Sequence, residues 1–167
     1  MKRYIRSAVV PVTAEDYEVK QDIIKDPSTP VRTLLLLRND NDPVIRNLAC
    51  LRLYDIIDNS STDAELMALI DTQAIDLCYR ISRSNNASAD VLTYLFNTSI
   101  CQPDNPKYGP IDNGMVPYCI ADNPNTPIEI LQALTNIHSN DESIDSEYWE
   151  QVRQNAKDAL NSRGYNL

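Results

Sequence analysis

The chain has 167 residues, only three of them glycine, and its 15 basic and 24 acidic side chains give a net charge of −9. This length suits one domain or a short repeat array, and so few glycines argue against glycine-rich phosphate loops and hairpin-rich β folds. The acidic balance argues against a protein that wraps nucleic acid with a basic surface.

Residues 1–25 are expected to form an N-terminal arm followed by a capping helix. Apolar and polar residues alternate weakly over residues 4–12, as in an extended segment. The helix is expected to run from Thr13 to Lys25. The apolar run Ala8-Val9-Val10 is too short for the apolar core of a signal peptide. No stretch approaches the ~20 apolar residues of a membrane span. These features predict a cytoplasmic protein that does not enter a membrane.

One sequence block recurs four times in the rest of the chain. The clearest copy is Asn123-Pro124-Asn125-Thr126-Pro127, and the other copies begin at Asp26, Asp58 and Ser84. Every copy has leucines 8 and 11 residues after its first residue: Leu34 and Leu37, Leu66 and Leu69, Leu92 and Leu95, Leu131 and Leu134. Leucines three apart share one face of a helix, so each block predicts a turn followed by a helix of roughly three turns.

The starts of these helices carry capping signals. A Thr before Pro is typical of an N-cap followed by proline at the first helical position. Thr62 with Glu65, and Thr126 with Glu129, have the spacing of a capping box.

A second helix is expected after each of these helices. The four predicted segments are Pro43–Ile57, Ala74–Ile81, a short Met115–Ala121, and Tyr148 onward to a stop at Gly164. The insertion Gln102–Gly114 contains three prolines and two glycines, which predicts a loop. The helix pairs define repeats at 26–57, 58–83, 84–122 and 123–163 within a single domain spanning residues 1–167.

The block at 123–134 resembles the signature of the variant leucine-rich repeat family. So do the segments Val152-Arg153-Gln154-Asn155-Ala156 and Ile45-Arg46-Asn47-Leu48-Ala49, and the resemblance extends over about residues 24–163. It implies an all-α fold, a right-handed helical-repeat solenoid of about four irregular repeats, similar in style to HEAT and armadillo repeats. It also implies that Arg46 and Arg153 pair with acids between repeats. The cysteine cluster that binds an iron–sulfur centre in some members is missing here, so that cofactor is not implied.

The sequence offers few residues for catalysis or metal binding. Cys50, Cys78, Cys101 and Cys119 form no Cys-x-x-Cys pair, and we interpret them as small buried apolar residues, with a metal site or disulfides as the alternatives. His138 is the one histidine and is expected near a helix C-terminus, where a cation complements the helix dipole. We therefore expect no enzyme, with no catalytic, cofactor-binding or metal-binding residue.

Charge is distributed unevenly along the chain. Residues 1–83 carry 11 basic and 13 acidic side chains, whereas residues 84–167 carry 4 basic and 11 acidic, a net charge of −7. Two partner-binding surfaces are candidates: the insertion, with Lys107, Tyr108 and Asp112, and the acidic run, with Asp141, Glu142, Asp145, Glu147 and Tyr148. The alternative for the acidic run is a solvated loop and an acid-rich first helical turn. The spacing of Trp149, Val152, Ala156 and Leu160 predicts a core stripe.

Three functions follow from these features. The first is a non-enzymatic scaffold that binds another protein through the acidic C-terminal half and the inserted loop. The second is an acidic, phage-encoded inhibitor that mimics nucleic acid and blocks a host or defence protein. The third is a helical-repeat nucleic-acid binder that uses the arginines of the first half (Arg32, Arg38, Arg46, Arg52, Arg80, Arg83), although these are expected mainly to pair with acids.

Overall fold

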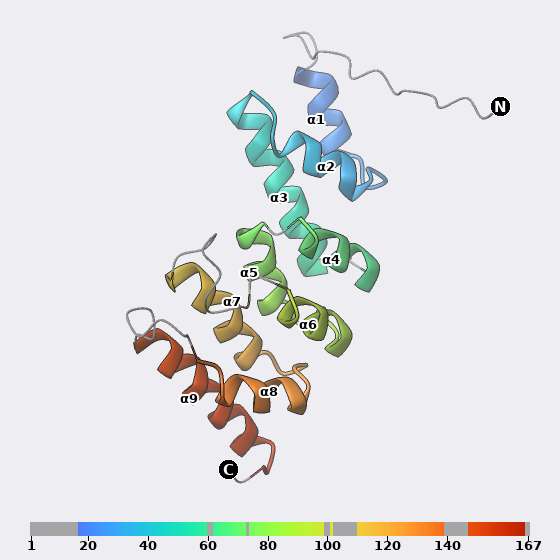
Figure 1. The fold of residues 1–167 in the computed structure, drawn as a ribbon. Coiled ribbons are helices and arrows are strands. Elements are labelled where there is room, and N and C mark those ends of the chain that lie inside the picture. The colour runs from blue at the N-terminus through green and yellow to red at the C-terminus, as the bar shows by residue number, and fades with distance from the viewer. Residues whose placement is uncertain are drawn as a thin grey trace, which may run out of the picture. The chain divides into compact units, whose positions relative to one another are not determined.

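The computed structural model describes residues 17–59, 62–72, 74–98, 101, 110–138 and 147–165, and for 110–114 it describes the backbone alone. These residues form helices joined by turns and contain no strand (Figure 1). The helices are α1 (Tyr17–Lys25), α2 (Val31–Leu37), α3 (Pro43–Asn59), α4 (Asp63–Ile70), α5 (Ile75–Arg83), α6 (Ala89–Phe96), α7 (Pro110–Asp122), α8 (Ile128–Thr135) and α9 (Glu147–Ser162). The all-α prediction is confirmed for this part of the chain.

The chain divides into two compact units, Met1–Leu53 and Tyr54–Leu167, with the boundary inside α3. The first unit contains α1, α2 and the first part of α3. Its core is small and is made by Ile24, Leu34, Ile45, Ala49 and Leu53, each no more than 4% exposed. Outside this core, Lys20 on α1 forms a 2.6 Å ion pair with Asp40, in which both side chains are largely buried.

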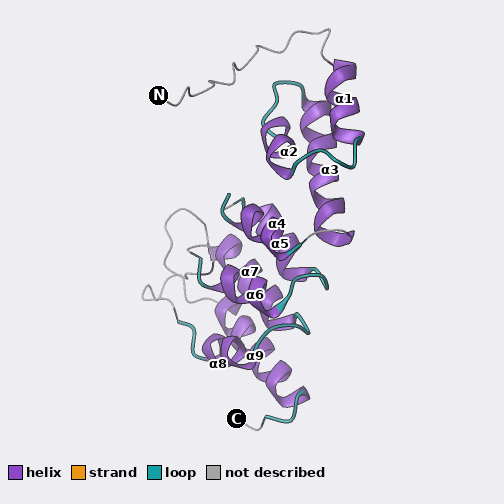
Figure 2. Ribbon diagram, turned by 90° about the vertical axis from the view of Figure 1, so that its right-hand side faces the viewer, coloured by secondary structure: helices purple, strands orange, loops and turns teal. Residues whose placement is uncertain are grey.

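The second unit is built in two layers of helices, which lie side by side in Figure 1 and overlap in the view of Figure 2. Helix α7 packs between α5 and α9 in one layer, and α4 packs against α6 in the other. Helix α8 packs mainly on α9 and also contacts α7. Helices that follow one another in the sequence are therefore neighbours in space, as short connections require.

The repeated leucines occupy the core as their spacing predicts. Seven of the eight are fully buried and Leu37 is half-buried. The predicted stripe on α9 is confirmed as well, because Trp149, Val152, Ala156 and Leu160 are all 0% exposed. Apolar burial of this kind is the main favourable term in folding.

One helix boundary differs from the sequence prediction and another agrees with it. Residues 110–114 were expected in a loop, but α7 already begins at Pro110 and continues through Pro117 to Asp122. Proline is well tolerated at the start of a helix because its missing N–H has no partner there. At the other end of the chain, the predicted stop at Gly164 is confirmed: Gly164 has φ +84°, and Tyr165 N–H donates to the Leu160 carbonyl across it, as in a Schellman cap.

The turns before α2, α6 and α8 share one hydrogen-bond pattern. The first residue of each block accepts a hydrogen bond through its side chain from the backbone N–H two residues later: Asp26 from Ser28 at 2.8 Å, Ser84 from Asn86 at 3.2 Å, and Asn123 from Asn125 at 2.9 Å. Its carbonyl also accepts from the N–H three residues later. The recurring Asp, Ser or Asn therefore shapes the turn directly.

The same turns are tied to one another across the second unit. Asn123, 4% exposed, donates through Nδ2 to the carbonyls of Ser82 (2.9 Å) and Ser84 (3.0 Å). Asn125 donates to the carbonyls of Asn85 and Ala87 in the same preceding turn. The turn that begins at Asn123 thus satisfies backbone acceptors that the turn beginning at Ser84 leaves open.

Similar bonds extend this chain of turns in both directions. Ser84 and Asn86 bond back to the carbonyls of Ile57 and Asp58 at the end of α3. At the far end, Arg163 donates to the carbonyls of Asn123, Pro124 and Thr126. We call this set of hydrogen bonds the turn ladder.

The two capping-box predictions have different outcomes. Thr62 accepts from the Glu65 N–H, and the Glu65 carboxylate accepts from the Thr62 N–H, so that box is confirmed. The Thr126 box is wrong, because Pro127 is the N-cap of α8 and the Thr126 hydroxyl donates to the Ile120 carbonyl. Thr29 bonds the Ile23 carbonyl in the same way. In both turns the threonine fastens its turn to the end of the preceding helix.

Arg46 and Arg153 also have a role different from the predicted one. Arg46 donates to the carbonyls of Asp40 and Asn41, just before its own helix. Arg153 donates to the carbonyl of Ile137, which precedes α9, and pairs with Glu150 on the same helix. Through these contacts, both arginines hold the turn inside their own helix pair.

Replacing Asn123 by Asp should destabilise the second unit. The substitution keeps the side-chain oxygen that accepts from the Asn125 N–H and shapes the turn. It replaces the amide nitrogen by an anionic oxygen, so the carbonyls of Ser82 and Ser84 lose their donor and face a negative charge. We expect the free energy of unfolding to fall by about 2–3 kcal/mol. Urea unfolding followed by the fluorescence of Trp149, the single tryptophan, measures this change. Asn85→Asp, in an exposed position of the preceding turn, is the control, and equal midpoints for the two variants would contradict the role given to Asn123.

The ion pair between Lys20 and Asp40 should make the first unit sensitive to acid. The bond from Lys20, together with the Asp42 N–H, lowers the pKa of Asp40 from 3.8. A lowered pKa contributes stability that is present above the unfolded value and is lost as pH falls through the folded value. We expect Lys20→Met to cost about 1 kcal/mol at pH 7 and almost nothing once Asp40 is protonated.

Urea unfolding followed by circular dichroism, at a series of pH values, measures this dependence. Lys25→Met on the same helix is the control because Lys25 is exposed and has no ion pair with a described residue. If the free energies of unfolding of wild type and Lys20→Met differ by the same amount at low pH, the difference does not come from the ion pair with ionised Asp40.

Candidate functional site

The structure describes only part of the two predicted binding surfaces. For Asp112 it describes the backbone within α7. Glu147 is exposed at the start of α9, and the adjacent Tyr148 is half-buried. The remaining predicted residues lie outside the described residues: Lys107, Tyr108, Asp141, Glu142 and Asp145.

Tyr148 opens onto a groove that the sequence did not single out. The groove consists of three hollows of about 460, 540 and 310 Å³, all within the second unit. The first and second hollows share Tyr79 and Arg83, and the second and third share Asp122 and Pro124. The three hollows therefore follow one another from the end of α3, across α5 and α7, to α9.

The first hollow is lined by polar groups that already bind one another. Arg80 makes a two-point ion pair with Asp58, and its guanidinium lies 4.7 Å from the centre of the Tyr54 ring. The Tyr54 hydroxyl donates to Asp76 at 3.0 Å. Paired charges and satisfied hydroxyls of this kind give a rigid wall with little free bonding capacity.

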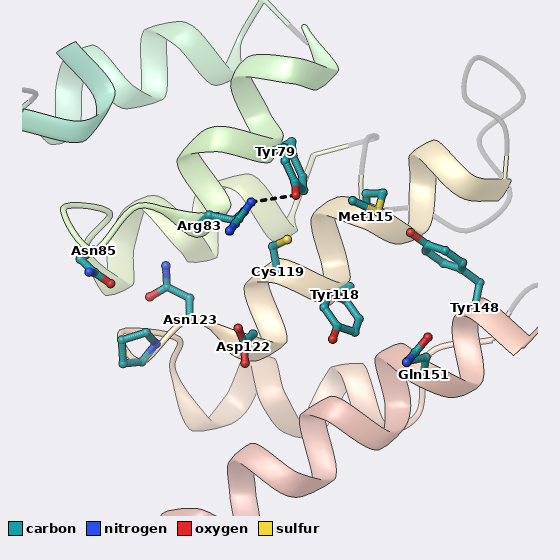
Figure 3. A pocket seen from close by; sticks show the side chains of 11 residues that line it. Tyr79, Arg83, Asn85, Met115, Tyr118, Cys119, Asp122, Asn123, Tyr148 and Gln151 are labelled. Atoms are coloured by element: carbon teal, nitrogen blue, oxygen red, sulfur yellow. Dashed lines mark hydrogen bonds between the residues drawn. The ribbon is translucent and has the colours of Figure 1, made fainter. Parts of the chain in front are cut away.

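The second hollow is the most aromatic of the three. Tyr79 from α5, Tyr118 from α7 and Tyr148 from α9 surround it, together with Met115 and Gln151 (Figure 3). All three tyrosines are half-buried, so each exposes part of its ring and is held by its neighbours. Half-buried tyrosines offer a large contact area at a low entropic cost.

Arg83 and Asp122 stand at the two junctions between hollows. Arg83 donates to the Tyr79 hydroxyl at 3.0 Å, and its guanidinium lies 5.5 Å from the centre of that ring. The bond to Tyr79 raises the pKa of Arg83, with a smaller contribution from Asp122. Both charges are exposed, and neither forms an ion pair with a described residue. The second hollow thus has an available cation at one end and an available carboxylate at the other.

The third hollow continues this acidic end. It is lined by Asp122 and Asp158, and Asp158 is exposed and accepts a hydrogen bond from the neutral Gln154 amide. Arg163 also lines this hollow, but it is engaged by the carbonyls of the turn ladder. The potential along the groove therefore becomes more negative from Arg83 toward α9.

The described residues hold no group of three or more His, Cys, Asp and Glu side chains that could bind a metal ion. His138 lies three residues after the end of α8, exposed and 3.4 Å from the Arg153 guanidinium. Among the described residues, no helix is both long and apolar enough to cross a membrane. No family model, curated protein or solved structure matches the chain, so the variant leucine-rich repeat assignment stays a prediction.

Sequence reasoning named Arg83 only as a candidate for nucleic-acid binding and missed most of the other groove residues, although they carry a positional signal. Tyr79 and Tyr118 each lie five residues before the first residue of a turn, Ser84 and Asn123 respectively. Arg83 and Asp122 each lie immediately before the same turn residues. Aligning the second helices on the turn that follows them, instead of on their apolar residues, would have brought out this pattern.

The four cysteines should react with alkylating reagents in a fixed order. Cys50 is half-buried, Cys119 is 7% exposed beside the second hollow, and Cys78 and Cys101 are buried. Burial raises the pKa of Cys119 and of Cys101, which lowers the fraction of reactive thiolate. With iodoacetamide at pH 7.5 we expect Cys50 to react first, Cys119 slowly, and the other two only on unfolding.

Peptide mapping by mass spectrometry over time measures this order. The reference is labelling in about 6 M urea, a concentration that unfolds many small domains. All four thiols are expected to react under this condition. Native-state labelling of Cys101 as fast as Cys50 would contradict the burial described here.

Proposed function

We propose that the protein is a non-enzymatic helical-repeat module that binds another protein along the groove of its second unit. The observation that carries this proposal is the second hollow, where three tyrosines from three helices surround a space of about 540 Å³. Tyrosine and methionine are enriched, and lysine depleted, at the centres of protein interfaces. The acidic C-terminal half remains part of the proposed binding surface, with the groove as its described portion.

The proposal includes a solenoid arrangement of the repeats. Three observations support it: helix pairs follow the four sequence blocks, α5, α7 and α9 pack in sequence within one layer, and the turn ladder links consecutive turns. Stacked repeats of this kind provide a continuous face on which a partner can contact several helices at once. The groove lies on that face.

We also place the protein in the cytoplasm. None of its four cysteines forms a disulfide, and three of them are buried; reduced thiols suit a reducing compartment. The two nucleic-acid hypotheses receive less support. Arg80 is paired with Asp58, and Arg46 binds backbone carbonyls, so these arginines do not offer a phosphate-binding row. The mimicry hypothesis depends on the stretch 108–152, which has eight acids and no Lys or Arg. Three of these acids lie outside the described residues: Asp141, Glu142 and Asp145.

Removing the groove tyrosines should abolish partner binding. We expect Tyr118→Ala and Tyr148→Ala each to weaken binding roughly tenfold or more, since buried aromatic anchors account for much of an interface's affinity. The tagged full-length chain is used for affinity capture from extracts of its native host, with bound proteins quantified by mass spectrometry. Fluorescence of Trp149 confirms that the variants are folded.

The control is Tyr94→Ala, which removes an exposed tyrosine from α6 that lines none of the three hollows. A partner retained by wild type and by the Tyr94 variant but lost from both groove variants supports the proposal. Equal recovery of every protein by all three variants overturns it, and loss of the partner on nuclease treatment would favour nucleic acid instead.

A further inference from the structure

We infer that the groove recognises an extended peptide segment with an aromatic side chain at its centre. This segment carries an acidic side chain on one side of the aromatic residue and a basic side chain on the other. This inference rests on the proposed function and specifies the chemistry of the partner. It depends on the placement of two available charges, Arg83 and Asp122, at the two ends of the aromatic hollow.

Arg83 is positioned to bind a carboxylate. One of its terminal nitrogens is held by the Tyr79 hydroxyl, and its guanidinium rests against the ring of that tyrosine. The side chain is exposed, and no described carboxylate lies within ion-pair distance of it. An arginine fixed at one nitrogen still has donors for a carboxylate and loses less entropy when it binds one.

Asp122 is positioned to bind a cation. It is exposed at the last residue of α7 and shares the third hollow with Asp158. Two carboxylates facing one hollow attract a lysine or arginine side chain more strongly than either does alone. The cation that lines the same hollow, Arg163, is held by three backbone carbonyls.

The space beside these two charges favours an aromatic side chain (Figure 3). It is bounded by Tyr79, Tyr118, Tyr148 and Met115, and aromatic rings gain additional energy when they pack against one another or against methionine. Gln151 and Asn85 at its rim carry amides, which can both donate to and accept from a peptide backbone. A segment of mixed charge therefore fits the groove better than a uniformly acidic or uniformly basic one.

Short capped peptides test this specificity. Each carries 4-fluorophenylalanine with Asp on one side and Lys on the other, separated from it by one to three glycines, and both charge orders are made. Binding to the full chain is measured by fluorine NMR of the peptide. We expect one order to bind better, and replacing its Asp by Asn or its Lys by Gln to weaken binding about three- to fivefold. Added salt should reduce the difference.

Exchanging the two charges on the protein should exchange the preference. The double variant Arg83→Asp with Asp122→Arg is expected to prefer the opposite charge order. The control pair Arg32→Glu with Asp22→Lys, on the first unit, also exchanges two exposed charges and should leave the preference unchanged. Equal affinities for the charged and neutral peptides, or a preference that survives the exchange, overturn the inference.

This outcome is distinguishable from failure of the proposed function. If the partner captured from the host is lost with Tyr118→Ala but retained by the charge-exchanged variant, the groove binds a protein and the charge assignment is wrong. If no captured partner depends on the groove tyrosines, the proposed function itself fails.

Discussion

The second unit depends on hydrogen bonds from the side chains of one turn to the backbone carbonyls of the turn before it. Asn123 illustrates the constraint, because its amide nitrogen binds two carbonyls while its amide oxygen shapes its own turn. Buried carbonyls without a donor are costly, so each repeat needs the next to supply one. Apolar burial favours stacking of the helices, whereas these bonds fix the register in which they stack.

The same asparagine fixes the geometry of the groove. The two carbonyls that it binds belong to Ser82 and Ser84, the residues on either side of Arg83. Asn123 itself directly follows Asp122. One buried side chain thus sets the separation of the groove's two available charges. Because both charges are placed by backbone that is bonded on both sides, the site needs no rigid side-chain network of its own.

Sequence patterns predicted the helices well and the site poorly, for physical reasons. Leucine spacing and turn residues act locally, so the starts of the helices and the buried faces follow from them; Leu66, Leu92 and Leu131 all lie in the core. The roles of Thr126 and Arg153 depend on carbonyls six and 16 residues away, which local cap rules do not include. The helical start of α7 was missed because Pro110 was interpreted as a turn residue.

The contacts within the fold change what the net charge implies about a binding partner. Residues 84–167 carry a net charge of −7, and two of their four cations, Arg153 and Arg163, are engaged by carbonyls within the fold. A uniformly acidic partner would therefore meet repulsion over most of this surface, and a uniformly basic one would meet Arg83 at the junction of the first and second hollows. Opposite charges on the partner relieve both conflicts, since like charges placed together at an interface are strongly unfavourable. Specificity in such a groove comes from the order of charges along the partner more than from its net charge.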